Sequence, residues 1–185
     1  MQIVDLSVEI HRQQPSLQPK RDALQSLPGS GSVAVSIVTD DGIIGRGDAS
    51  FGRIGGGPDA LAALIQHELK PLVLGHDPSL VRQLHAEMRR ETEYHGTQGL
   101  ATIGIAAVDT ALWDCLGKAR GVPCWQLWGG AHTTVRAYAM VGWLNYDDAE
   151  VQAICARAVD QGFRAVKIKV GYPTLRQDVQ RVETV

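Results

Sequence analysis

The order of segments in the last third of the chain is the feature that most restricts its fold. Residues 135–142 and 163–170 have the composition of short strands, whereas residues 147–161 and 174–185 have helical spacing. Strand, helix, strand and helix with short connections are typical of the opening of a parallel β/α array. We therefore expect residues 131–185 to be the beginning of a (β/α) barrel, truncated after its second strand and the helix that follows.

The second of these strands carries two lysines. Its central stretch, Val166–Gly171, has the sequence VKIKVG. Because side chains alternate between the two faces of a strand, Lys167 and Lys169 point the same way. Two ammonium groups on one face repel each other and lose hydration, so at least one is expected to give up its proton more easily and to act as a general base. The alternative is a solvated edge strand with two exposed lysines.

The first 130 residues have a different pattern, which predicts an α+β capping domain. Apolar residues alternate with polar ones over residues 2–11, 33–39 and 43–48, and this alternation indicates three strands. A tight turn between the second and third strands favours an antiparallel three-stranded meander. We expect two domains, with residues 1–130 forming the cap and residues 131–185 the incomplete barrel.

Three helices are expected to complete the cap. The first spans residues 59–70 and ends at Pro71. The second begins near Asp77 and places Leu80 on the same face as two later apolar residues. The third and strongest covers residues 100–120, where an apolar stripe repeats at helical spacing.

Two segments of the cap are expected to be loops. Residues 12–31 and 49–58 are rich in proline or glycine and contain few apolar residues. Long loops inside compact domains tend to be functional, so these two are candidates for a lid that contacts the substrate. The glycines of residues 49–58 offer a second interpretation, a phosphate cradle, but the order of strand, glycine motif and helix needed for dinucleotide binding is missing.

Composition and charge exclude several classes of partner. The chain has 185 residues, of which 44% are hydrophobic and 21% charged, and its net charge is −2. This charge gives no reason to expect binding to nucleic acid or to an anionic membrane. No signal peptide or apolar run long enough to span a bilayer is evident. The three cysteines lack metal-ligand spacing, which favours reduced thiols in a cytoplasmic protein.

Four stretches resemble the mandelate racemase/muconate lactonizing enzyme family of the enolase superfamily. The closest resemblance is to the mandelate racemase-like subgroup, and it covers the N-terminal portion of such enzymes. The stretches are residues 39–47 (TDDGIIGRG), 107–123 (AVDTALWDCLGKARGVP), 127–130 (LWGG), and 162–173 (GFRAVKIKVGYP) with Gln177 and Asp178. They are similar, in turn, to the family's first hairpin, long cap helix, barrel entry and second barrel strand.

The resemblance implies an Mg²⁺-dependent enzyme that removes the proton α to a carboxylate and passes through an enediolate. Carried over by position, Lys169 is the base, and Lys167 lies beside it and contacts the substrate carboxylate. Met140 occupies the substrate-facing stretch of the first barrel strand, where the mandelate racemase-like subgroup has a serine. In the family the metal carboxylates come from later barrel strands. We therefore expect no metal ligands within residues 1–185, with the Mg²⁺ ligands beyond Val185.

The expected substrate is a small-molecule carboxylate, either a 2-hydroxy acid or an acid sugar, and the expected assembly is a homo-oligomer. Racemase or acid-sugar dehydratase is the leading function. A cycloisomerase or epimerase of the same superfamily, or a non-catalytic truncated cap-domain module, are the alternatives. Asp109 and Asp114 could form a pair of catalytic carboxylates, but a spacing of five places them on different faces of a helix, which favours surface or capping roles.

Overall fold

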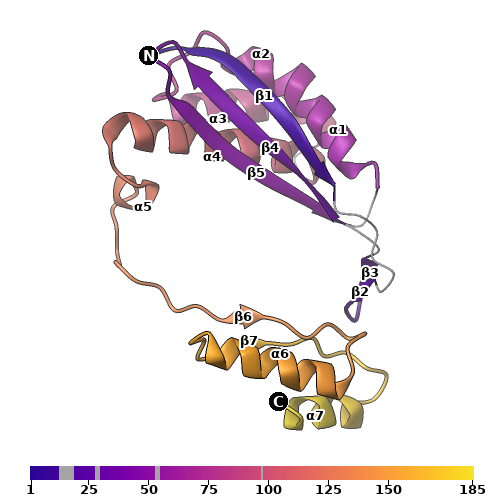
Figure 1. The fold of residues 1–185 in the computed structure, drawn as a ribbon. Coiled ribbons are helices and arrows are strands. Elements are labelled where there is room, and N and C mark those ends of the chain that lie inside the picture. Colours follow the sequence, from indigo (N-terminus) through magenta and orange to yellow (C-terminus); the bar gives the residue numbers. More distant parts are fainter. Residues whose placement is uncertain (13–18, 28–29, 53–54, 97) are drawn as a thin grey trace. The chain divides into compact units, whose positions relative to one another are not determined.

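The computed structural model describes residues 1–185 except 13–18, 28–29, 53–54 and 97 (Figure 1). The chain divides into two compact units. The first contains residues 1–14 and 30–131, and the second contains residues 15–29 and 132–185. The second unit thus draws part of its chain from the region between the first two strands of the first unit.

The first unit contains the expected antiparallel meander. Its strands are β1 (Ile3–Arg12), β4 (Ser30–Thr39) and β5 (Ile44–Gly52), in the order β1-β4-β5. Both neighbouring pairs are antiparallel. Every second residue of β4 from Gly31 to Thr39 is buried, as the alternating pattern predicts, and the large apolar ones are Val33, Val35 and Ile37. This part of the α+β fold is confirmed.

The two strands at the centre and edge of this sheet are longer than the sequence predicts. β4 begins at Ser30 and β5 continues to Gly52, so both reach into the segments expected to be loops at residues 12–31 and 49–58. The two strands support each other, because their pairing continues from Val38↔Ile44 to Ser30↔Gly52. Residues 13–18, 28–29 and 53–54 of those predicted loops lie outside the described residues.

The first helical segment continues past the proline that was expected to end it. It consists of α1 (Gly57–Leu64), a π-helical turn η1 (Ile65–Leu69) and α2 (Lys70–Val73). In the π-helical turn the Lys70 N–H donates to the Ile65 carbonyl, which shifts the hydrogen-bond ladder by one residue. Pro71 then lies in the first turn of α2, where its missing N–H leaves no gap in the ladder. The predicted end at Pro71 is therefore wrong.

The next helices follow the predicted order. α3 (Val81–Glu91) begins later than expected, and Leu80 is exposed, whereas Leu84 and Met88 are fully buried. A short 3₁₀ helix, η2 (Glu93–His95), connects α3 to the long helix of the unit. Leu80 precedes the helix proper, so it does not share the buried face that the helical spacing assigned to it.

The long helix α4 (Leu100–Arg120) forms the core of the first unit together with the sheet. It ends at Gly121, which has a left-handed conformation with φ of 66°. By length and composition α4 could cross a membrane, which corrects the expectation that no such segment exists. However, 56% of the apolar stretch is buried inside the folded unit, as in the core helix of a globular domain. A short helix, α5 (Cys124–Leu127), follows it.

The second unit contains the beginning of a parallel β/α array. Strand β6 (Ala139–Met140) pairs in parallel with β7 (Val166–Lys167), and helices α6 (Asp148–Asp160) and α7 (Leu175–Glu183) follow the two strands. The regular strands are shorter than predicted. Backbone hydrogen bonds nevertheless extend the pairing, because the Lys169 N–H donates to the Gly142 carbonyl at 2.9 Å.

The segment expected to be the loop 12–31 contains a small hairpin that packs within the second unit. Strands β2 (Lys20–Arg21) and β3 (Ser26–Leu27) pair in antiparallel fashion. The Leu144 N–H donates to the Arg21 carbonyl at 2.9 Å, and the Arg21 N–H donates to Asn145 Oδ1 at 3.1 Å. The hairpin is therefore fixed to the loop that follows β6.

Candidate functional site

The two lysines lie where β7 ends. Lys167 is the last residue of the regular strand and is exposed, whereas Lys169 is partly buried two residues later. Between them, the Ile168 side chain lies so close to Gly142 that a Cβ at Gly142 would be 3.0 Å from Ile168 Cγ2. Carboxyl ends of parallel strands are the usual place for catalytic groups in β/α folds. The structure places both sequence-predicted lysines there.

An indole ring lies beneath the amine of Lys169. Lys169 Nζ is 5.0 Å from the centre of the Trp143 ring, and Lys20 Nζ, from the hairpin, is 5.7 Å from the same centre. Both distances are within the range in which a cation is attracted to an aromatic face. Two amines from distant parts of the sequence thus meet at one ring, which gives this end of the unit a local positive charge suited to an anionic ligand.

The hairpin contributes a carboxylate near the same amine. Asp22 Oδ1 accepts hydrogen bonds from the N–H groups of Leu24 and Gln25 at 2.9 and 3.0 Å. The bond from Leu24 is the main cause that holds the pKa of Asp22 below its ordinary value, and the positive charge of Lys169 adds to the effect. Asp22 is therefore an anion whose hydrogen bonds stabilise the hairpin tip.

Close packing brings the tip of the hairpin against the end of β7. Gly171 has a φ of 124°, and a Cβ placed on it would lie 2.4 Å from the Cβ of Ala23. Only glycine tolerates both the backbone conformation and this approach. Residues 20–27 of the predicted substrate loop thus lie beside the lysine-bearing segment, whereas residues 49–58 belong to the first unit.

Met140 occupies the strand position beside one of the lysines. In the parallel pair it is the register partner of Lys167, and its side chain is exposed. The structure therefore brings Met140 next to the lysine pair. No hydroxyl or charged group is present at this position, so Met140 can offer a ligand only apolar contact.

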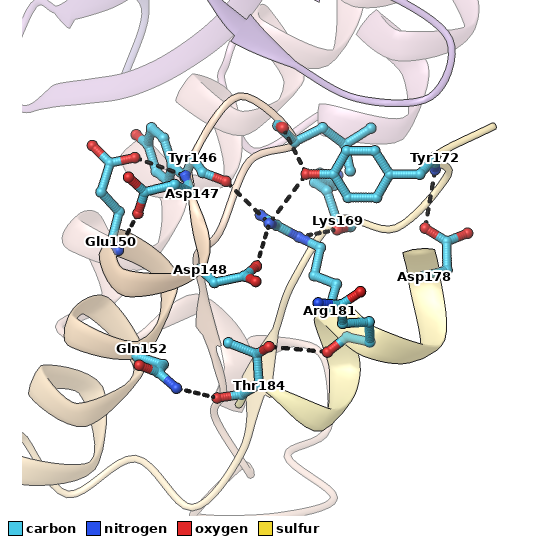
Figure 2. Close-up of polar contacts among 12 residues, drawn as sticks. Tyr146, Asp147, Asp148, Glu150, Gln152, Lys169, Tyr172, Asp178, Arg181 and Thr184 are labelled. Atoms are coloured by element: carbon cyan, nitrogen blue, oxygen red, sulfur yellow. Dashed lines mark hydrogen bonds and ion pairs between the residues drawn. The ribbon is translucent and has the colours of Figure 1, made fainter. Parts of the chain in front are cut away.

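A buried arginine holds the two strand ends together, as Figure 2 shows. Arg181 of α7 is only 2% exposed. Its guanidinium donates to the Lys169 carbonyl from Nε at 3.1 Å, to the Tyr146 carbonyl from Nη1 at 3.0 Å and to the Trp143 carbonyl from Nη2 at 2.6 Å. Hydrogen bonds from a charged donor are stronger than neutral ones, so the arrangement is rigid.

The turn after β7 is fixed by two further side chains (Figure 2). Asp178 accepts the N–H groups of Gly171 and Tyr172 at 2.8 and 3.0 Å, and these bonds hold the pKa of Asp178 below its ordinary value. The Tyr172 hydroxyl donates to the Leu144 carbonyl at 3.0 Å. The backbone just after Lys169 is therefore held by α7, and the Tyr172 side chain is held by the loop after β6.

Sequence reasoning did not find Trp143, Lys20 or Arg181. Lys20 could have been identified as a candidate because it lies in the loop that was predicted to contact the substrate. Trp143 directly follows the first barrel strand, the region where functional side chains are expected in such folds. Arg181 gives no such signal, because its partners are mainly backbone carbonyls.

The paired carboxylates of the long cap helix have structural roles. Asp114 accepts the Arg46 N–H at 2.7 Å and the Lys118 ammonium at 2.6 Å. Asp109 contacts Nδ1 of His85 at 3.1 Å. These separate partners agree with the expectation that the two aspartates act at the surface and not as a catalytic pair.

The part of the chain that the structure describes does not fit a magnesium site. Among those residues no three His, Cys, Asp or Glu side chains are grouped so that they could hold a metal ion. Carboxylates in this part of the unit already have other partners, since Asp22 and Asp178 bind backbone N–H groups and Asp148 lies 4.0 Å from Arg181. Mg²⁺ prefers several oxygen ligands in octahedral geometry, which these residues do not supply.

Comparison with known protein families gives a match over most of the chain. Residues 5–129 match the family model described as "Mandelate racemase / muconate lactonizing enzyme, N-terminal domain". The chain is 36% identical over 156 residues to arabinonate dehydratase of Saccharolobus solfataricus, which covers 83% of this chain and 41% of the relative. It is also 36% identical over 150 residues to 3,6-anhydro-alpha-L-galactonate cycloisomerase of Streptomyces coelicolor, covering 81% of this chain and 41% of that one.

Solved structures resemble the chain in the same way. A racemase from Streptomyces coelicolor A3(2) with bound magnesium superposes with a TM-score of 0.89 at 31% identity, covering 98% of this chain and 50% of that one. L-talarate/galactarate dehydratase from Salmonella typhimurium LT2, liganded with Mg and L-lyxarohydroxamate, gives a TM-score of 0.85 at 25% identity, covering 97% of this chain and 46% of that one. The chain therefore spans about half the length of these relatives.

Proposed function

The chain belongs to the mandelate racemase/muconate lactonizing enzyme family of the enolase superfamily, and from this premise we propose that Lys169 is a general base that removes the proton α to a carboxylate. The observation that carries the proposal is the position of the Lys169 amine, beyond the carboxyl end of β7 and 5.0 Å from the Trp143 ring. Lys167, two residues earlier, supplies a neighbouring positive charge.

The proton transfer uses the neutral amine of Lys169. Its lone pair takes the α-proton, and the electrons of the broken C–H bond move toward the substrate carboxylate to give an enediolate. The positive charges of Lys167 and Lys20 attract the substrate carboxylate. Met140 and the hairpin of residues 20–27 line the substrate side of the site. The proposal places the Mg²⁺ ligands outside residues 1–185.

An acid sugar is the preferred substrate class within this proposal. The relatives named above include an arabinonate dehydratase and a galactonate-derived cycloisomerase, and one solved relative is a talarate/galactarate dehydratase. These names favour a dehydratase or a racemase acting on a polyhydroxy acid, with cycloisomerase or epimerase as the alternative. Each of these reactions begins with removal of an α-proton, so the role proposed for Lys169 is common to all of them.

The test is exchange of the substrate α-proton with solvent. The full-length protein is incubated with Mg²⁺ in D₂O with a panel of aldonates and aldarates, and loss of the α-proton signal is followed by NMR. Lys169→Ala is expected to slow exchange by about 10²–10⁴-fold, the usual contribution of a general base. Lys169→Arg serves as a matched variant, because it keeps the positive charge but cannot act as a base near neutral pH.

Two results would contradict the proposal. One is exchange at the parental rate in both Lys169 variants. The other is an unsubstituted protein that exchanges none of these acids. Lys167→Ala gives a further check, because loss of a positive charge that attracts the substrate carboxylate is expected to raise KM more than it lowers kcat.

A further inference from the structure

We propose that Arg181 is a positioning residue that holds the Lys169 amine against the ring of Trp143. The inference rests on the function proposed for Lys169 where it concerns catalysis, but its geometric part stands on the contacts of Arg181 alone. One guanidinium binds the backbone of both members of the lysine–indole pair. Nε donates to the Lys169 carbonyl at 3.1 Å, and Nη2 donates to the Trp143 carbonyl at 2.6 Å.

The backbone of Lys169 has no unused polar group. Its N–H donates to the Gly142 carbonyl at 2.9 Å, and its carbonyl accepts from Arg181. The loop that carries Trp143 is fixed by the same side chain at a second point, the Tyr146 carbonyl, 3.0 Å from Nη1. With both backbones fixed, the distance of 5.0 Å between Lys169 Nζ and the Trp143 ring depends only on side-chain rotation.

The burial of Arg181 argues for a specific role. A buried charge is costly unless it is paired and fully hydrogen-bonded. The ion-pair partner of Arg181 is Asp148, which is 4.0 Å away and has a 53% exposed side chain, so backbone carbonyls provide most of the compensation. An apolar side chain would fill this position without that cost. The arginine is useful because it can bind carbonyls from two separate segments at once.

Tyr172, which follows β7, also contacts the guanidinium of Arg181. Nη1 of Arg181 also donates to the Tyr172 hydroxyl at 3.3 Å, and the guanidinium carbon lies 5.6 Å from the centre of the Tyr172 ring. Tyr172 in turn donates to the Leu144 carbonyl. Figure 2 shows Tyr146, Lys169 and Tyr172 around the guanidinium. Replacement of Arg181 therefore removes hydrogen bonds from the segments after both strands at once.

The test reads the position of the Lys169 side chain directly. In the full-length protein, the ε-CH₂ groups of lysine are labelled with ¹³C and observed by NMR, and Lys169→Arg assigns the Lys169 signal. A methylene close to an indole face is displaced upfield by the ring current, and Trp143→Leu identifies that displacement. Arg181→Met, which keeps the aliphatic stem, is expected to remove most of the displacement, whereas Arg181→Lys is expected to retain part of it.

A matched control lies on the same helix. Arg176 is exposed on α7, so Arg176→Met is expected to leave the Lys169 signal unchanged. Lys118, in the first unit, reports whether the fold elsewhere is intact. The proposal is overturned if the Lys169 displacement survives in Arg181→Met, or if Arg176→Met removes it equally. Unfolding of the second unit in both Arg181→Met and Arg181→Lys would assign Arg181 to stability alone and would also overturn it.

Kinetics then separate this inference from the proposed function. In the active protein, Arg181→Met is expected to lower kcat by about tenfold or more with little change in KM, because a misplaced base affects the chemical step more than binding. An unchanged kcat would contradict the catalytic part. If the NMR signal responds to Arg181 while Lys169→Ala leaves α-proton exchange intact, the function proposed for Lys169 fails and the geometric inference stands.

Discussion

Gly47 of β5 is a point of very close contact between the sheet and helix α4, and its replacement by alanine gives a sharp test of the fold. An added Cβ would lie 2.0 Å from the Ala107 carbonyl oxygen and 2.9 Å from the Ala111 nitrogen. Both are helix backbone atoms, which cannot rotate away. Since ordinary contacts begin at 3.4 Å, strand and helix must separate by about 1.4 Å, the difference between 3.4 and 2.0 Å.

Such a separation opens the core along the whole of α4. Ala107 and Ala111 are fully buried, and Val35, the register partner of Gly47, lies in the same core. Overpacking a tight core costs about 1–3 kcal/mol, and we expect Gly47→Ala to reach the upper end, because a rigid backbone and not a side chain must move. A loss of about 3 kcal/mol is a large part of the 5–15 kcal/mol that is typical of a domain.

The assay is urea unfolding combined with amide hydrogen exchange of α4, which reports the first unit alone. Gly47→Ala should lower the urea midpoint and speed exchange in α4. Gly55→Ala is the matched control, because Gly55 is exposed and has nothing within 4 Å of an added Cβ. That variant should stay within about 0.5 kcal/mol of the parent. A Gly47→Ala protein with the parental midpoint and exchange rates would show that the packing argument is wrong.

Two further predictions concern titratable groups. Hydrogen bonds from the N–H groups of Gly171 and Tyr172 lower the pKa of Asp178 from its ordinary value of 3.8. The Asp178 carboxylate therefore stabilises the folded protein at pH values above the pKa that it has in the unfolded chain. This stabilisation is lost as the pH falls through the lower pKa of the folded state. The excess stability of the parent over Asp178→Ala, measured by urea unfolding, should therefore shrink below about pH 4, and an equal difference at pH 6 and pH 3 would contradict this. Burial raises the pKa of the Cys115 thiol, so iodoacetamide should label the partly exposed Cys124 first, as followed by mass spectrometry; equal labelling rates would count against it.

The capping domain was predictable because local pattern and tertiary packing agree there. Residues 100–120 carry a helical apolar stripe followed by Gly121, and the structure has a helix with those bounds and a left-handed glycine at its end. The alternation over residues 33–39 likewise matches the buried face of β4. In both elements the local secondary-structure preference agrees with the packing of the folded unit.

The elements that were predicted wrongly are stabilised by contacts or turns outside their own residues. The hairpin of β2 and β3 has only two residues in each strand, and it is fixed by bonds from Leu144 and to Asn145. Nothing within residues 20–27 indicates those partners. Similarly, Pro71 is compatible with a continuing helix only because a π-helical turn precedes it, and single-residue propensities do not describe such a turn.

Helix α7 shows most clearly why the candidate site could be predicted only in part. Its apolar residues Leu175, Val179 and Val182 are exposed, whereas Arg181 is buried. Helical periodicity would assign these residues the opposite way. Arg181 is buried because its guanidinium finds carbonyl acceptors at the ends of both strands, which an apolar side chain cannot use.

The two lysines and the arginine therefore differ in how they can be recognised. Lys167 and Lys169 carry their chemistry in residue type and spacing, so the sequence alone indicates them. Arg181 acts on the carbonyls of Trp143, Tyr146 and Lys169, and every residue type has a carbonyl. Substitutions at the accepting positions leave these hydrogen bonds possible, whereas a substitution at Arg181 removes the donor for all of them. Arg181, which fixes the position of the proposed base, therefore cannot be recognised from the residue types of its partners.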